Sequence, residues 1–186
     1  MATRRSSDEQ FTAAAFKRAP TVEMSTWYKG ILTSTLASER DTGGAFDLVV
    51  SHMRRGTEPP PHVHEHEHEF FYVLEGTVDV YVGAECFRAT AGECVFLPKR
   101  RPHAFKIQSP EIRMLVLIVP GGFLSAINRM AAPAEKLEIP PDGAQLTYAT
   151  ADLEETMKVF DKYGVRILSP DEIPRELPAF PLSPGK

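Results

Sequence analysis

The 186-residue sequence has few cysteines, little net charge and no long hydrophobic run. Its two cysteines, Cys86 and Cys94, are too few for a disulfide scaffold, so we expect two buried thiols and a reducing, cytoplasmic environment. The 21 basic and 25 acidic residues give a net charge of −4, which provides no footprint for nucleic acid. The longest apolar run, 114–119, is much shorter than the roughly 18 residues of a membrane helix. We therefore expect a soluble protein with no membrane or nucleic-acid partner.

Short runs of β-branched and aromatic residues dominate the first two thirds of the chain. Turn residues such as Gly43-Gly44, Glu75-Gly76 and Ala91-Gly92 interrupt these runs about every ten positions, which is typical of a sandwich or small barrel. The runs are 30–36, 45–53, 69–74, 77–82, 86–89, 94–97 and 112–119. They predict an antiparallel, all-β domain.

The pattern changes to helical spacing after Pro120. Apolar residues recur from Phe123 to Met130 until Pro133 stops them, which predicts a short helix. A second helix is expected to start at Thr150 or Asp152 and to end near Gly164; its expected apolar face is Leu153, Met157 and Phe160. The proline-rich tail from Ser169 predicts an extended strap. We divide the chain into an amino-terminal arm (1–20), a β domain (21–120) and an extension (121–186) packed on that domain.

Four of the six histidines lie within seven residues of each other, at His62, His64, His66 and His68. Residues two apart on a strand share a face and lie about 6.6 Å apart, so a neighbouring pair of imidazoles can share one ion. His62 and His68 would be about 20 Å apart on a straight strand, too far for one site. Glu69 has the opposite parity and reaches the His62 and His64 side only if the chain turns between Glu65 and His68.

Alternating histidine and glutamate can also form a solvated strip or a loose surface metal trap. A distant third imidazole argues against that alternative. His103 follows Gly92 and Pro98 at the start of a strand that the hydrophobic pattern places in the same sheet.

Together these residues resemble the two sequence motifs of the cupin superfamily. The first motif is matched by Gly56, His62, His64, Glu69 and Gly76, and the second by Gly92, Pro98 and His103. Arg100 stands where the second motif usually has glycine, and Ile107 where it usually has asparagine. The segments Phe71 to Gly76 and Tyr163-Gly164-Val165 are similar to the single-domain quercetin 2,3-dioxygenase-like subgroup (cupin 2).

The resemblance implies a single cupin β-barrel, also described as a double-stranded β-helix or jelly roll, with short C-terminal helices. It implies one divalent metal held by His62, His64, Glu69 and His103, whereas His66 and His68 match no ligand position. Three imidazoles and one carboxylate leave open positions and suit iron, manganese, nickel, cobalt, copper or zinc, so the ion stays open. It further implies a homodimer paired through sheet edges.

The activity implied is that of a metal-dependent dioxygenase, an oxidoreductase that opens the ring of a flavonol or another enolisable aromatic with O2. Glu69 would also take the substrate proton. Two alternatives remain: a non-oxidative isomerase or decarboxylase, because the same ligands serve Lewis-acid chemistry, and a non-enzymatic small-molecule-binding cupin.

The substrate pocket of such an enzyme should be apolar. Strand parity places Phe71 on the side of Glu69, and Phe105 and Ile107 on the side of His103, so these three residues are the candidate substrate contacts. Trp27 and Tyr28 either close one rim or anchor an amino-terminal strand. The helix 123–130 either covers the barrel mouth or simply packs against it.

Overall fold

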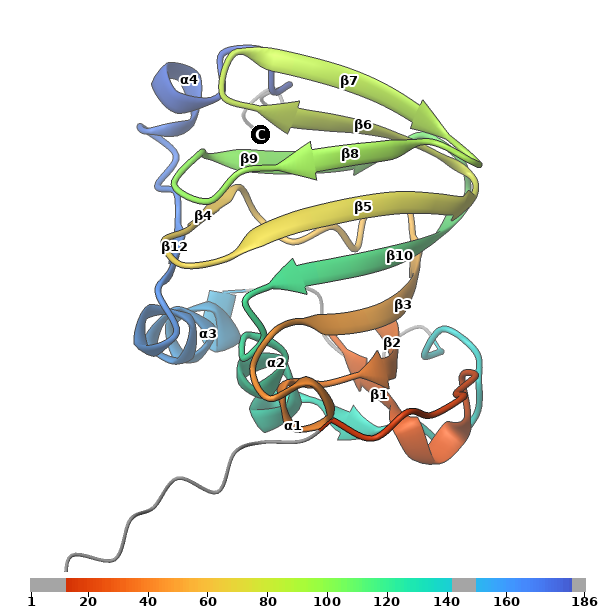
Figure 1. The fold of residues 1–186 in the computed structure, drawn as a ribbon. Coiled ribbons are helices and arrows are strands. Elements are labelled where there is room, and N and C mark those ends of the chain that lie inside the picture. The colour runs from red at the N-terminus through yellow and green to blue at the C-terminus, as the bar shows by residue number, and fades with distance from the viewer. Residues whose placement is uncertain (1–12, 142–149, 182–186) are drawn as a thin grey trace, which may run out of the picture.

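Two antiparallel sheets enclose the hydrophobic core in the computed structural model, which describes residues 13–141 and 150–181 (Figure 1). The larger sheet has the strand order β11-β1-β2-β3-β10-β5-β8 and the smaller one β12-β4-β9-β6-β7. The large-sheet strands are β1 (Ser25–Tyr28), β2 (Ile31–Ala37), β3 (Asp47–Arg54), β5 (His68–Glu75), β8 (Cys94–Leu97), β10 (Glu111–Val119) and β11 (Ala132–Pro133). Those of the small sheet are β4 (His62–His64), β6 (Thr77–Val82), β7 (Glu85–Thr90), β9 (His103–Ile107) and β12 (Val165–Ile167). This jelly-roll arrangement confirms the all-β expectation.

The longer strands follow the hydrophobic runs in the sequence. All seven runs correspond to strands, with boundaries shifted by at most two residues. On β10 buried and partly exposed residues alternate, because one face of the strand lines the barrel and the other faces outward. The strands β1, β11 and β12 have only two to four residues each, too few to show such a period.

The expected helices form as α2 (Leu124–Met130) and α3 (Thr150–Lys162), beside the shorter segments η1 (Val22–Met24), α1 (Glu39–Thr42) and α4 (Ile173–Glu176). The expected apolar face of α3 is wrong in part, because Met157 is 44% exposed. Phe160 is buried as expected, and Thr156, four residues away on the same face, is buried in place of Met157. The side chain of Leu153 lies outside the described residues. Gly164 follows α3 with a φ of 72°, which suits a helix-ending glycine.

The proline-rich tail from Ser169 is not wholly extended, because it contains the short helix α4. The strand β12, just before this tail, pairs with β4, so that Val165 lies opposite His64 and Ile167 opposite His62. Farther along, Leu168 and Leu177 are buried in a small cluster with residues of three small-sheet strands: Val63, Tyr81 and Ala104. The segment from β12 to Leu177 therefore covers one face of the small sheet and completes the edge beside the histidine strand, as the blue segment of Figure 1 shows.

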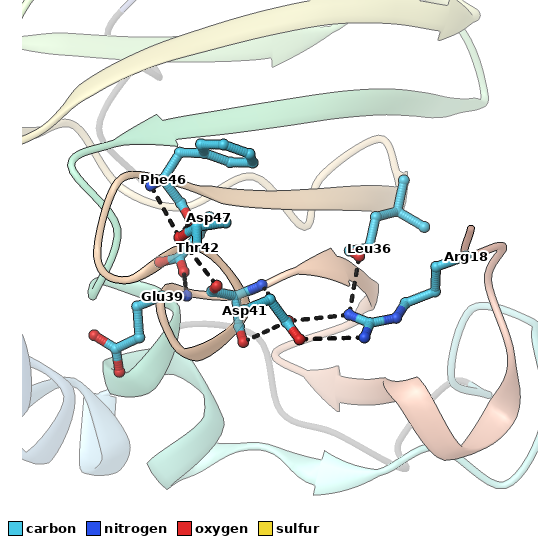
Figure 2. A network of polar contacts seen from close by, with 8 residues as sticks. Arg18, Leu36, Glu39, Asp41, Thr42, Phe46 and Asp47 are labelled. Carbon is cyan, nitrogen blue, oxygen red and sulfur yellow. Dashed lines mark hydrogen bonds and ion pairs between the residues drawn. The ribbon is translucent and has the colours of Figure 1, made fainter. Parts of the chain in front are cut away.

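A network of hydrogen bonds stabilises the short helix α1 and the residues around it (Figure 2). The Arg18 guanidinium donates to both carboxylate oxygens of Asp41, at 3.0 and 3.2 Å, and to the carbonyl of Leu36. Asp41 also accepts hydrogen bonds from the backbone N–H and the hydroxyl of Ser38, which precedes α1. The Glu39 N–H donates to Asp47, the first residue of β3. The connection between β2 and β3 is thus held by side chains on both sides.

The expectation for the cysteines is wrong, since Cys86 and Cys94 are both exposed free thiols. They lie on β7 and β8, the last strands of the two sheets, and edge strands leave alternate side chains uncovered. Among the residues that the structure describes, no helix is long and apolar enough to cross a membrane.

Candidate metal centre

Three strands, two from the small sheet and one from the large sheet, bring four potential ligands together inside the barrel. His62 and His64 lie on β4, Glu69 near the start of β5, and His103 at the start of β9, directly opposite His62. Their ligand atoms all lie within 4.8 Å of one another. A bend at Glu65 and His66 separates β4 from β5, which provides the turn that the parity of Glu69 requires.

Hydrogen bonds at the far side of each imidazole fix its tautomer. His62 Nδ1 lies 2.9 Å from the Pro60 carbonyl, and His103 Nδ1 lies 3.0 Å from the Arg101 carbonyl. Because a carbonyl only accepts, both Nδ1 atoms carry the proton. His64 Nδ1 lies 3.1 Å from a carboxylate oxygen of Glu67 and donates to it in the same way. All three Nε2 atoms are therefore left with lone pairs that point inward.

This arrangement fits a bound cation. The Nε2 atoms of His62 and His103 are only 3.1 Å apart, and two lone pairs at that distance repel unless a cation lies between the rings. His64 Nε2 and Glu69 Oε2 are fully buried and have no hydrogen-bond partner. Buried polar atoms without partners are costly, and coordination of a metal would satisfy both.

The electrostatics favour the protonation states of metal ligands at His62 and Glu69. Burial, together with His103 and His64, lowers the pKa of His62 to about 3. Burial opposes ionisation of Glu69, but the neighbouring imidazoles of His64 and His103 outweigh it and lower the pKa of this carboxyl to about 2. Burial also opposes protonation of His64, yet Glu69 and the hydrogen bond to Glu67 raise the pKa of this imidazole. Glu69 is thus an anion and His62 a neutral imidazole at neutral pH.

A largely apolar cavity opens onto this cluster. His62 and Glu69 form part of its wall, and most of the remaining wall is aliphatic or aromatic, from both sheets and from α2 and α3. Phe123, directly before α2, packs edge-on against His64 with ring centroids 4.7 Å apart, and lies 5.4 Å from the ring of Phe160. The helical segment expected at 123–130 therefore covers the cavity, since Phe123, Leu124 and Ile127 all line it.

The candidate substrate contacts lie in different places. Phe71 and Phe105 line the cavity and meet edge to face with ring centroids 5.6 Å apart. Ile107 is not part of the cavity wall; it is 2% exposed, within the main hydrophobic core. It shares the parity of Phe105 but lies one pair farther along β9, opposite Val78, where packing against β6 closes the barrel.

The other aromatic and histidine candidates also differ in whether they lie at the site. Tyr28 lines the cavity, whereas Trp27 packs with Leu32 and Ala134 and donates to the Glu138 carbonyl, so it anchors β1. His66 is exposed, and His68 Nδ1 accepts a hydrogen bond from the Lys99 N–H. Neither histidine is part of the cluster of four ligand atoms.

Sequence reasoning missed three residues near the site. Glu67, which orients His64, belongs to the histidine and glutamate tract and gave no separate signal, because only the bend turns it inward. Thr33 and Ser51 line the cavity from β2 and β3. Both lie in runs predicted as strands, and alternation along those runs was the only available sign of their direction.

Comparison with known proteins identifies the barrel. Residues 49–120 match the family model of the cupin domain (Cupin_2). Residues 49–120 are thus a cupin domain, in agreement with the two motifs and the jelly-roll fold.

Three individual proteins are similar to part of the chain at low sequence identity. The chain is 26% identical over 110 residues to quercetin 2,3-dioxygenase of Bacillus subtilis; the match covers 59% of this chain and 33% of that protein. It is also similar to the structure of KdgF from Halomonas sp., with a TM-score of 0.45, 24% identity and coverage of 50% of this chain and 81% of that one. Pac13 of Streptomyces, described as a nucleoside dehydratase, has a TM-score of 0.48 and 16% identity over 66% of this chain and 95% of that chain.

Proposed function

We propose that this protein is a metal-dependent cupin dioxygenase that opens the ring of a flavonol or another enolisable aromatic. The observation that carries the proposal is the cluster of three inward-facing imidazoles and one buried carboxylate at the wall of an aromatic-lined cavity. The partial similarity to a quercetin dioxygenase supports the choice of reaction. We assign His62, His64, Glu69 and His103 as the ligands of one divalent transition metal.

The side chains around the cluster would divide the work. A metal held there would acidify a bound enol and bring it together with O2. Glu69 would accept the enol proton, and its low pKa requires that the enol be acidified in this way first. Phe71 and Phe105 would hold the planar ring against the cluster and exclude water from it.

The proposed reaction consumes one O2 for each flavonol. Two carbon–carbon bonds of the central ring break, carbon monoxide leaves with the carbon that lay between them, and both atoms of O2 remain in the ester product. No further oxidant or reductant is needed, because the substrate supplies all four electrons.

The ligand assignment is tested by elemental analysis of protein purified without a histidine tag. We expect about one transition metal per chain in the wild type and its loss in His103→Ala. His66→Ala is the matched control, because His66 belongs to the same tract but is exposed and lies outside the cluster. Full metal occupancy in His103→Ala would show the assignment to be wrong.

The reaction is tested by anaerobic incubation of the metal-loaded protein with 3-hydroxyflavone, followed by O2. We expect loss of the flavonol absorbance, uptake of one O2 and release of one carbon monoxide. If the protein binds flavonol but consumes no O2, the dioxygenase proposal is wrong, and the non-oxidative alternatives remain for the same site.

We also propose a cytoplasmic homodimer. Apolar side chains cross the outward face of the large sheet in two rows, with Phe96 and Tyr72 exposed to 46% and 41%. The register pairs Leu117 with Phe70 and Phe70 with Phe96. A monomer exposes few apolar patches of this kind. Light scattering coupled to gel filtration should give twice the chain mass of 20.7 kDa, and a monomer at micromolar concentration would contradict the proposal.

A further inference from the structure

The cavity wall has a second polar region besides the metal centre. Thr33 and Ser51 face each other across β2 and β3, and both line the cavity. They are 7% and 9% exposed, and no hydrogen bond within the described part of the chain uses either side-chain hydroxyl. Two hydroxyls that face the cavity on an otherwise apolar wall are suited to a polar group of a ligand.

Tyr28 adds a third hydroxyl from β1. Its OH lies 3.7 Å from Met130 Sδ, at the end of α2, and 3.4 Å from Thr156 Oγ1 on α3. The Tyr28 hydroxyl is thus fixed at the end of α2 that is opposite to Phe123, the residue that packs on His64. We call Tyr28, Thr33 and Ser51 the hydroxyl region.

The strand register gives the distance between this region and the metal centre. Glu69 pairs with Ile118, and Ile118 with Asp47, so the metal end of the barrel includes the start of β3. Ser51 lies four residues farther along β3. At about 3.3 Å per residue the two regions are about 13 Å apart along the strand.

Helix α2 gives an independent measure of the same distance. Phe123 contacts His64 just before the helix, and Met130 at its last residue contacts Tyr28. The seven residues of α2 span about 10 Å at 1.5 Å per residue. Both measures therefore describe an elongated cavity with polar groups at its two ends and apolar walls between them.

We infer that the hydroxyl region binds a second polar group of the substrate. This group lies about 10 Å from the enol oxygens of the substrate, which face the metal centre. The substrate is then an elongated aromatic enol with a hydroxyl on its distal ring. This inference rests on the proposed function for the aromatic enol, and it assigns to Thr33 and Ser51 the selection among such compounds. One good hydrogen bond to a buried partner corresponds to a two- to tenfold difference in affinity, or about 0.5–1.5 kcal/mol.

The test measures flavonol binding without O2, so that it is independent of turnover. Metal-loaded protein is titrated anaerobically with 3-hydroxyflavone, 3,4′-dihydroxyflavone and 3,7-dihydroxyflavone, and the flavonol fluorescence gives each Kd. We expect at least one dihydroxy compound to bind about five- to tenfold more tightly than 3-hydroxyflavone. In the double variant Thr33→Val, Ser51→Ala, the Kd of 3-hydroxyflavone should equal that of the dihydroxy compound, so that their ratio falls to about one.

Thr35→Val is the matched control, because Thr35 lies on the same strand but does not line this cavity, and it should keep the wild-type ratio. Equal affinity for all three flavonols, no binding of any of them, or an unchanged preference in the double variant would overturn the inference. If the dihydroxy compound binds preferentially but the protein consumes no O2 in the separate turnover experiment, the inference about binding is upheld and only the dioxygenase reaction is rejected.

Discussion

At the residue scale, the Glu67 side chain orients His64, a proposed metal ligand, from outside the cluster. The other two imidazoles donate to backbone carbonyls, whereas His64 donates to this carboxylate, which is only 7% exposed. We predict that Glu67→Gln weakens metal binding about tenfold, because the carboxylate raises the basicity of the imidazole that it orients. Competition with a chromophoric chelator measures the affinity. Glu65→Gln, on the exposed neighbour, should have no effect, and equal affinities of the two variants would contradict this role.

Asp41 is a second residue whose protonation matters, here for stability. The hydrogen bonds from Arg18, together with those from Ser38, hold the pKa of Asp41 well below its usual range. A lowered folded-state pKa adds stability above the unfolded value of about 3.9, and this stability is lost as the pH falls below it. We predict that Asp41→Asn costs about 1 kcal/mol at pH 7, typical of a lost helix-capping contact, and clearly less at about pH 2, where the pH approaches the lowered folded-state pKa. Urea unfolding at both pH values measures this; a constant difference would exclude the ionic contribution.

At the scale of elements, Asp47 connects the start of β3 to both α1 and α2. It is fully buried, and its carboxylate accepts hydrogen bonds from the backbone N–H groups of Glu39, Gly122 and Leu124. Ser125 on α2 also donates to the Glu39 carboxylate at 2.7 Å. These contacts fix the start of the helix that covers the cavity.

We predict that Asp47→Asn lowers the free energy of unfolding by about 2 kcal/mol, since an amide has one acceptor oxygen for three donors and leaves a buried N–H unpaired. Hydrogen exchange should accelerate at the amides of residues 122–130, more than elsewhere in the barrel. Asp171→Asn, on an exposed residue of the tail, is the control and should change neither quantity. Unchanged exchange in α2 would mean that the helix is held by packing alone.

At the scale of the whole molecule, the candidate metal centre joins segments that are far apart in the chain. His62 and His103 are adjacent although they are 41 positions apart, and β12, beyond α3, pairs with the strand of His62 and His64. A ligand that binds only the folded state stabilises it by mass action, by about 4 kcal/mol at a thousandfold excess over Kd. We predict that removal of the metal with a chelator lowers the Tm by several degrees and that added metal restores it. His103→Ala should show no such shift, and a metal-independent Tm in the wild type would contradict a structural coupling.

The periodic elements were the predictable part of this fold. The long strands and both helices follow alternation and helical spacing, because these periods reflect which face of an element is buried. The cysteines and Met157 were expected to be buried and are exposed. Their burial depends on whether a neighbour covers an edge strand or a helix face, and no local pattern carries that information.

The sequence by itself determined the barrel class and the set of four residues that the structure brings together. Spacing allowed His62 and His64 to share an ion, and the resemblance added Glu69 and His103. Only the tertiary structure decided which groups surround them: it turns Glu67 inward, moves Ile107 into the core and lines the cavity with Thr33 and Ser51. The physical reason is that a strand's period fixes the side on which a residue lies, whereas its neighbours depend on register, bends and the packing of distant segments.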